Sequence, residues 1–136
     1  MEKFQISEDI TVLCIKASSF PEGVLDAHKK MHSVIPFTNE RKYFGISRPN
    51  KTGAIEYYAA AEKLKEGEAE QLKPIKIILK AGEYISIVIP DYLKDVESIT
   101  RSFAKLLTVK DIDPNGYCVE FYYNSKDVRC MIRLKG

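Results

Sequence analysis

The sequence has no tryptophan, only two histidines, and only three cysteines among its 136 residues. Cys14, Cys118 and Cys130 show no C-x-x-C spacing, and each lies in an apolar stretch. Isolated thiols of this kind are typical of a reducing compartment, so we expect free cysteines and a cytoplasmic location. Because no other type of ligand clusters with the histidines, we expect neither a metal site nor a cofactor.

Strong net charge, long apolar runs and a signal segment are also lacking. The 21 basic and 19 acidic residues give a net charge of +2, which is too small to indicate a nucleic-acid or membrane partner. No apolar run approaches the ~20 residues that a membrane-spanning helix requires, and we expect no signal peptide. With 45% hydrophobic and 29% charged residues, residues 1–136 are expected to form a single globular domain.

Two parts of the chain share one order of predicted elements, which hydrophobic periodicity and turn signals define. The first part has a strand over 10–15, a helix from about 19 to 35, and strands over 42–47 and 54–60. The second part has a strand over 83–89, a helix over 96–109, and strands over 116–124 and 128–134, and one further strand over 75–79 precedes these elements.

This shared order indicates an internal duplication. One repeat spans about 4–62, a charged connector spans 63–73, and the second repeat spans about 74–135. The pattern predicts an α+β fold in which duplicated β-α-β-β units, related by a pseudo-twofold, form antiparallel sheet with two helices on one side. We expect a ligand cleft between the repeats.

A single carboxylate, Glu120, lies in the middle of the apolar and aromatic strand over 116–124. Alternation places it with Cys118 and Tyr122 on one face of that strand. A carboxylate beside tyrosines on an apolar strand either recognises a ligand or pairs with a neighbouring cation, because burying it alone is costly.

The predicted pairing of the last two strands suggests which cation that would be. Pairing across a four-residue loop at 124–127 puts Glu120 on the face away from the helices, beside Arg129 and Arg133. An exposed cross-strand ion pair there would be worth at most ~1 kcal/mol. At this point ligand recognition and the ion pair both remain open.

Other residues extend the recognition hypothesis. Glu56 and Tyr58 share a face of the strand over 54–60, which echoes the pattern of Glu120 and Tyr122. Tyrosine faces attract cations by ~0.5–2 kcal/mol each, and aromatic residues are frequent in the predicted strands. We expect Tyr58, Tyr84 and Tyr122 to face the cleft.

The element order, the Gly82-x-Tyr84 pattern before the second helix and the Glu120-x-Tyr122 strand after it resemble the gyrase-inhibitor-like small-molecule-binding domain. That domain is also the effector-binding module of some bacterial transcription activators of the AraC and MerR types. The resemblance covers residues from about 4 to 134. It implies that Glu120, with Tyr122 and Tyr84, faces cationic, lipophilic ligands, as in multidrug binding. The chain departs from the family in lacking tryptophan, which leaves the ligand's identity open.

Three functions follow as hypotheses. The first is a stand-alone module that senses or sequesters an amphipathic, cationic ligand in an aromatic cleft with an acidic residue. The second, implied by the same resemblance, is a hydrolase of reactive electrophiles with Glu120 as general base. The third is a protein-interaction role such as topoisomerase inhibition. Without a helix-turn-helix segment, transcription regulation would need a separate DNA-binding partner, and we expect binding rather than catalysis.

Overall fold

The computed structural model describes residues 1–67 and 73–135, so residues 68–72 of the predicted connector lie outside the described residues. The chain forms two compact units. The continuous unit is Ile10–Leu79, and the split unit combines Met1–Asp9 with Lys80–Gly136. The bounds of these units differ from those of the predicted repeats. The continuous unit includes residues 75–79, which the sequence analysis places in the second repeat, and the split unit includes residues 1–9, which precede the continuous unit.

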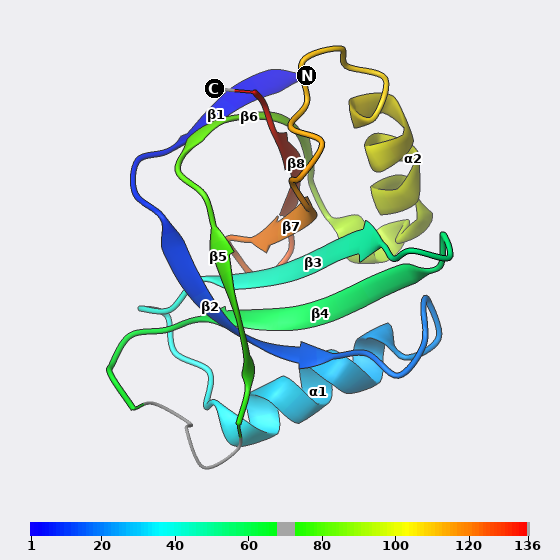
Figure 1. Ribbon diagram of the computed structural model, residues 1–136. Coiled ribbons are helices and arrows are strands. Elements are labelled where there is room, and N and C mark those ends of the chain that lie inside the picture. Colours follow the sequence, from blue (N-terminus) through cyan, green and yellow to red (C-terminus); the bar gives the residue numbers. More distant parts are fainter. Residues whose placement is uncertain (68–72, 136) are drawn as a thin grey trace. The chain divides into compact units, whose positions relative to one another are not determined.

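The continuous unit is an antiparallel sheet with one helix packed on it (Figure 1). Its elements are β2 (Ile10–Lys16), α1 (Val24–Val34), β3 (Tyr43–Pro49), β4 (Ile55–Glu62) and β5 (Ile75–Leu79). The strand order is β3-β4-β2-β5, and α1 packs against β4 and β2.

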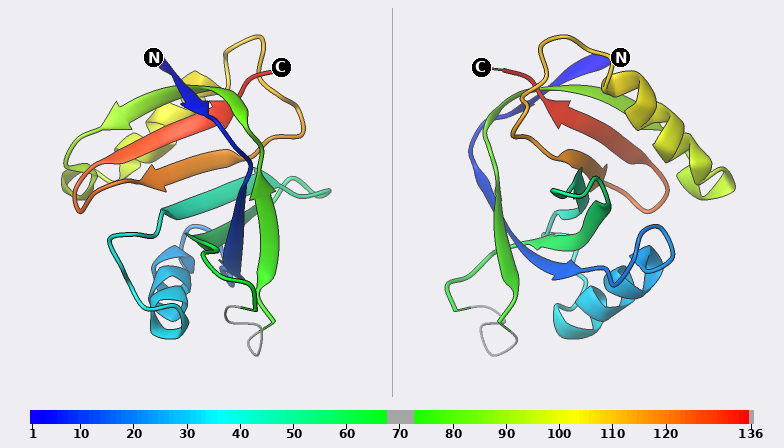
Figure 2. Two further views of the ribbon diagram at one scale, coloured as in Figure 1. Left: turned by 90° about the vertical axis from the view of Figure 1, so that its left-hand side faces the viewer. Right: turned by 45° about the vertical axis from the view of Figure 1, so that its right-hand side comes forward.

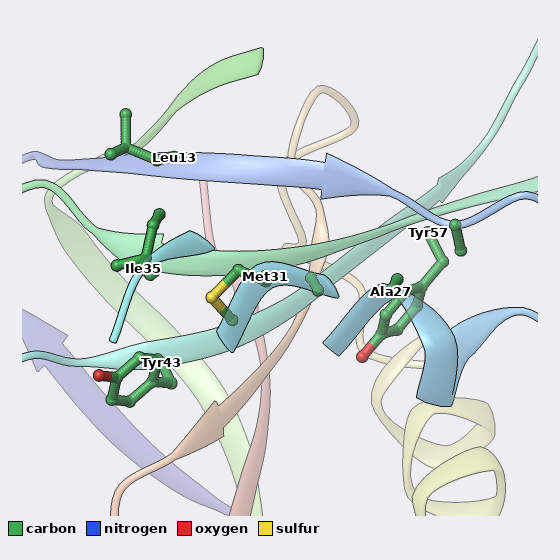
Figure 3. Close-up of a cluster of buried hydrophobic side chains, with 9 residues drawn as sticks. Leu13, Ala27, Met31, Ile35, Tyr43 and Tyr57 are labelled. Carbon is green, nitrogen blue, oxygen red and sulfur yellow. The ribbon is translucent and has the colours of Figure 1, made fainter. Parts of the chain in front are cut away.

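The core of this unit lies between α1 and the sheet. Met31 of α1 is fully buried against Leu13 of β2 and Tyr57 of β4, and Figure 3 shows these side chains together with Ala27. Apolar residues at helical spacing on α1 and alternating apolar residues on the strands produce this contact.

The helix α1 begins later than the sequence analysis predicts. The chain makes turns before it, and Gly23 caps the helix without any side-chain hydrogen bond. A Cβ atom at Gly23 would lie 2.9 Å from backbone atoms of Ser19. Gly23 has no side chain and can therefore approach Ser19 closely, so the chain makes a tight turn where the sequence analysis predicts a regular first helical turn.

The split unit repeats the same plan (Figure 2). Its elements are β1 (Glu2–Ile6), β6 (Gly82–Ile89), the 3₁₀ turn η2 (Tyr92–Lys94), α2 (Glu97–Leu106), β7 (Cys118–Tyr122) and β8 (Val128–Arg133). The strand order is β1-β6-β8-β7, and α2 packs against β6 and β8. Phe103 and Leu106 of α2 cover Val128, Cys130 and Ile132 of β8.

The predicted α+β class and the duplicated β-α-β-β order are confirmed: β2-α1-β3-β4 in one unit matches β6-α2-β7-β8 in the other. Each unit also has an outer strand, β5 beside β2 and β1 beside β6. The sequence analysis does not predict β1. Neither helix in the described residues is long and apolar enough to cross a membrane.

Candidate ligand-binding site

Glu120 is a buried carboxylate on the helix-covered face of the split unit. In the β7–β8 pair it lies opposite Cys130, while Cys118 lies opposite Ile132. Directly opposed residues of an antiparallel pair project to the same face. Glu120 therefore shares its face with the apolar residues of β8 that α2 covers, and only 8% of it is exposed.

The predicted direction of Glu120 is wrong. The observed register places Phe121 opposite Arg129, so the hairpin loop is one residue longer than the four residues assumed from the sequence. Because side chains alternate between faces, a shift of one residue moves Glu120 from the face away from the helix to the face that carries it.

Both candidate arginine partners have their described contacts elsewhere. Arg129 donates to Glu2 Oε1 at 2.7 Å and to Ser86 Oγ at 2.9 Å. Arg133 donates to Asp113 Oδ2 at 3.1 Å and to the Ala81 carbonyl at 3.0 Å. Both arginines project to the face opposite Glu120, so they serve to anchor strands and loops of the split unit.

Two tyrosines are close to Glu120. The Tyr122 hydroxyl donates a hydrogen bond to Glu120 Oε1, and the Tyr92 ring packs against the Tyr122 ring with centroids 5.5 Å apart. Burial raises the pKa of Tyr92, and the charge of Glu120 raises it further. Together these residues place an acid next to two aromatic rings within a largely apolar surrounding.

The neighbouring thiols experience the same charge. Burial, and secondly the charge of Glu120, raise the pKa of Cys118 to about 11. Burial raises the pKa of Cys130 as well, with Glu120 again the second cause. Both thiols are therefore protonated near neutral pH and behave as small apolar side chains rather than as nucleophiles.

Tyr84 belongs to the same unit but lies on the other face of its sheet. It is opposite Arg133 in the β6–β8 pair, is 2% exposed, and donates to the Lys80 carbonyl at 2.7 Å. Burial is the main cause that raises its pKa to about 12. The structure therefore does not bring Tyr84 to Glu120 within this unit.

Glu56 and Tyr58 belong to β4 of the continuous unit. They lie on the face of β4 away from α1, since the intervening Tyr57 is in the core under that helix. Glu56 forms an ion pair of 3.1 Å with Lys16. Their assignment to a ligand site remains a prediction.

Tyr92 is the site residue that the sequence analysis did not select. It lies after β6, in a segment without strand or helix periodicity, and nothing in its local pattern connects it with Tyr122. The signal that could have found it is the turn chemistry around it: Pro90 and Asp91 end β6 and bend the chain toward the β7–β8 hairpin.

No metal site is indicated in the part of the chain that the structure describes, where no group of three or more His, Cys, Asp or Glu residues could hold an ion. Among the contacts described above, the groups around Glu120 include its own carboxylate, two phenols and two protonated thiols. They can bind a cation through charge and aromatic faces, or exchange a proton with a bound molecule.

No family model matches the sequence, and no curated protein matches it either. The fold does have similar solved structures. An integron cassette protein from the mobile metagenome of Vibrio cholerae aligns over 98% of this chain and 95% of its own, with a TM-score of 0.72 and 14% identity.

A second similar structure is SAV2435 bound to tetraphenylphosphonium, which covers 99% of this chain and 93% of its own at a TM-score of 0.66 and 13% identity. A third is a hydrolase from Listeria innocua, with 98% and 90% coverage, a TM-score of 0.55 and 10% identity. At such identities the likeness shows the fold alone, and function must be argued from the site.

Proposed function

We propose that this protein binds an amphipathic organic cation, with Glu120 as the countercharge and Tyr122 and Tyr92 as aromatic contacts. The observation that carries the proposal is the buried carboxylate of Glu120, which accepts a hydrogen bond from Tyr122 and lies in an apolar, aromatic part of the split unit. The sensing or sequestering role of a gyrase-inhibitor-like domain fits this chemistry.

The physical reason is the low polarity around the acid. A charge pair is stronger in such surroundings than in water, and each tyrosine face adds ~0.5–2 kcal/mol for a cation placed over it. Phenyl groups on the ligand would gain further free energy by leaving water, at about 25 cal/mol per Å² of apolar surface buried. The site therefore favours a molecule that joins a cation to aromatic groups.

The comparison with SAV2435 supports the same ligand class, because that structure holds tetraphenylphosphonium, a cation surrounded by phenyl groups. The likeness between the two chains is one of fold at 13% identity. It makes tetraphenylphosphonium a suitable probe for this protein, and the proposed role of Glu120 rests on the geometry above.

Calorimetric titration with tetraphenylphosphonium and with tetraphenylborate tests the proposal, because the two ions share a shape and differ in charge. We expect the protein to prefer the cation. Glu120→Gln should weaken cation binding tenfold or more, about 1.4 kcal/mol, and reduce the preference over the anion. Glu97→Gln, an exposed acid on α2 of the same unit, should leave both unchanged. Equal cation affinity for the wild type and Glu120→Gln would refute the proposal.

Hydrolysis of a reactive electrophile is the second candidate function. The contact between Glu120 and Tyr122 supports it, as does the similar fold of the Listeria innocua hydrolase. Glu120 would accept a proton from water as the water oxygen bonds to the electrophilic carbon, and a tyrosine would give a proton to the departing oxygen.

A panel of epoxides and activated esters, followed by mass spectrometry of the products, tests this second function. Turnover should occur with the wild-type protein and be abolished in Glu120→Gln. Saturable binding of these compounds without any product would count against catalysis and leave the binding function in place.

A further inference from the structure

The segment that carries Tyr92 is fastened to the β7–β8 turn. The Tyr92 amide donates to the Lys126 carbonyl at 3.1 Å, and the Asp91 amide donates to Asp127 Oδ1 at 3.0 Å. In the right-hand view of Figure 2, this turn lies beside the yellow-green segment that leads into α2. Two successive amides of the segment are thus bound by two successive residues of the turn.

The turn itself is organised around its own side chains. Asn124 Oδ1 accepts hydrogen bonds from the amides of Lys126 at 2.9 Å and Asp127 at 2.7 Å. Asn124 Nδ2 in turn donates to Asp127 Oδ2 at 3.1 Å. One oxygen of the Asp127 carboxylate is therefore held by the turn, and the other is directed at the Asp91 amide.

The electrostatics agree with this arrangement. The hydrogen bond from Asn124, and secondly the one from the Asp91 amide, lower the pKa of Asp127. The carboxylate thus remains ionised and a strong acceptor under ordinary conditions. Asp91 itself adopts left-handed backbone angles (φ 49°, ψ 47°), which turn the chain sharply before Tyr92 and are uncommon for a residue with a side chain.

The two hydrogen bonds that hold the Asp91 and Tyr92 amides, here called the clamp, act on the site through Tyr92. Its ring packs against Tyr122, and Tyr122 donates to Glu120. Residues that follow Tyr92 bring little packing of their own: Leu93 is 70% exposed and Val96 is 56% exposed. The Tyr92 ring also packs against the core cluster under α2, and the two backbone hydrogen bonds fix the place from which the ring enters this contact.

We propose that Asp127 is a positioning residue for the ligand site: its carboxylate holds the Asp91 amide, and this places the ring of the next residue, Tyr92, as one aromatic wall beside Glu120. Asp127 does not touch the ligand. The inference rests on the proposed binding function and adds to it the residue that orders an aromatic contact and sets the affinity for ligands with phenyl groups.

The test measures tetraphenylphosphonium affinity in the full chain. Asp127→Ala should weaken binding about fivefold, as should Tyr92→Ala, and the double variant should lose no more than either alone because both changes remove the same wall. Asp127→Asn keeps an oxygen for the Asp91 amide and should retain most of the affinity. Asp95→Ala is the matched control, because Asp95 ends the same segment and its side chain pairs with exposed Arg101.

A second measurement follows the clamp without any ligand. Amide hydrogen exchange at Asp91 and Tyr92 should become faster in Asp127→Ala and stay unchanged in Asp95→Ala. Faster exchange with wild-type affinity would overturn the positioning role while leaving the binding function intact. Additive losses in the double variant would also overturn it. Absence of tetraphenylphosphonium binding in the wild type would refute both proposals together.

Discussion

Glu120 lies directly opposite Cys130 across the β7–β8 pair. This relationship places the carboxylate on the face that α2 covers and brings its charge to the thiols of Cys118 and Cys130. It also separates Glu120 from Arg129 and Arg133, which project to the other face and bind Glu2 and Asp113. The proposed site therefore lies on the face of β7 that also carries Cys118 and Tyr122.

The thiol of Cys118 reports the charge of Glu120. Its pKa is raised to about 11 by burial first and by Glu120 second. Glu120→Gln removes the second cause, so more thiolate forms at pH 9 and iodoacetamide should alkylate Cys118 roughly two- to fivefold faster. Mass spectrometry of the Cys118 peptide measures the rate, and Glu97→Gln is the control. If Cys118 is alkylated at the same rate in Glu120→Gln as in the wild type, the charge of Glu120 does not act on this thiol.

Arg129 should matter for the fold of the split unit. Its guanidinium bonds Glu2 and Ser86 and lies 4.4 Å from the centroid of the Phe4 ring, so it fastens the edge strand β1. Arg129→Met should lower the free energy of unfolding by about 1–3 kcal/mol and speed amide exchange in Glu2–Ile6. Lys126→Met, at an exposed position, should do neither. Equal stability of the two variants would contradict this assignment.

The sequence contained enough information for the order of elements but too little for the register of the last hairpin. Strand and helix patterns in each repeat are local and strong, which is why β2, α1, β3 and β4, and their counterparts, were predictable. The outer strand β1 is polar at its start, with Glu2 and Lys3, and it exists because β6 pairs with it. Such pairing is a long-range property that local propensity does not report.

The candidate site was predictable in part for the same reason. Alternation along β7 correctly grouped Glu120 with Cys118 and Tyr122, but the face depended on the loop length, which differs by one residue from the assumed turn. Tyr92 was missed because its position is fixed by hydrogen bonds from η2 to a turn more than thirty residues away, as in the contact between Asp91 and Asp127. Only the folded chain reveals that contact.

Gly82 begins β6 in a backbone conformation that favours glycine, with φ +134°. A Cβ atom there would lie 3.1 Å from Arg133 Nη2. Gly82→Ala should therefore lower the free energy of unfolding by about 1–3 kcal/mol, measured by urea unfolding. Gly53 has φ +88° and nothing within 4 Å of the added atom, so Gly53→Ala should cost less. A larger loss at Gly53 would show that the contact with Arg133 is unimportant.

His28 should make the stability of the continuous unit depend on pH. Its Nε2 atom lies 2.8 Å from the Tyr57 hydroxyl, and burial, followed by the charge of His32, lowers its pKa from 6.5 to about 4. Between these values the unfolded chain binds a proton that the folded chain does not. Stability is therefore fully present above pH 6.5 and is lost as the pH falls toward 4, by up to about 3 kcal/mol.

Urea unfolding at pH 7 and pH 4.5 measures this loss. His28→Gln does not titrate and keeps a polar group near Tyr57, so its unfolding free energy should fall less between the two pH values than that of the wild type. His32 is more exposed, and although burial lowers its pKa too, His32→Gln should retain most of the wild-type dependence. If His28→Gln and the wild type lose the same free energy, acid destabilisation has another origin, such as the carboxylates of the surface ion pairs.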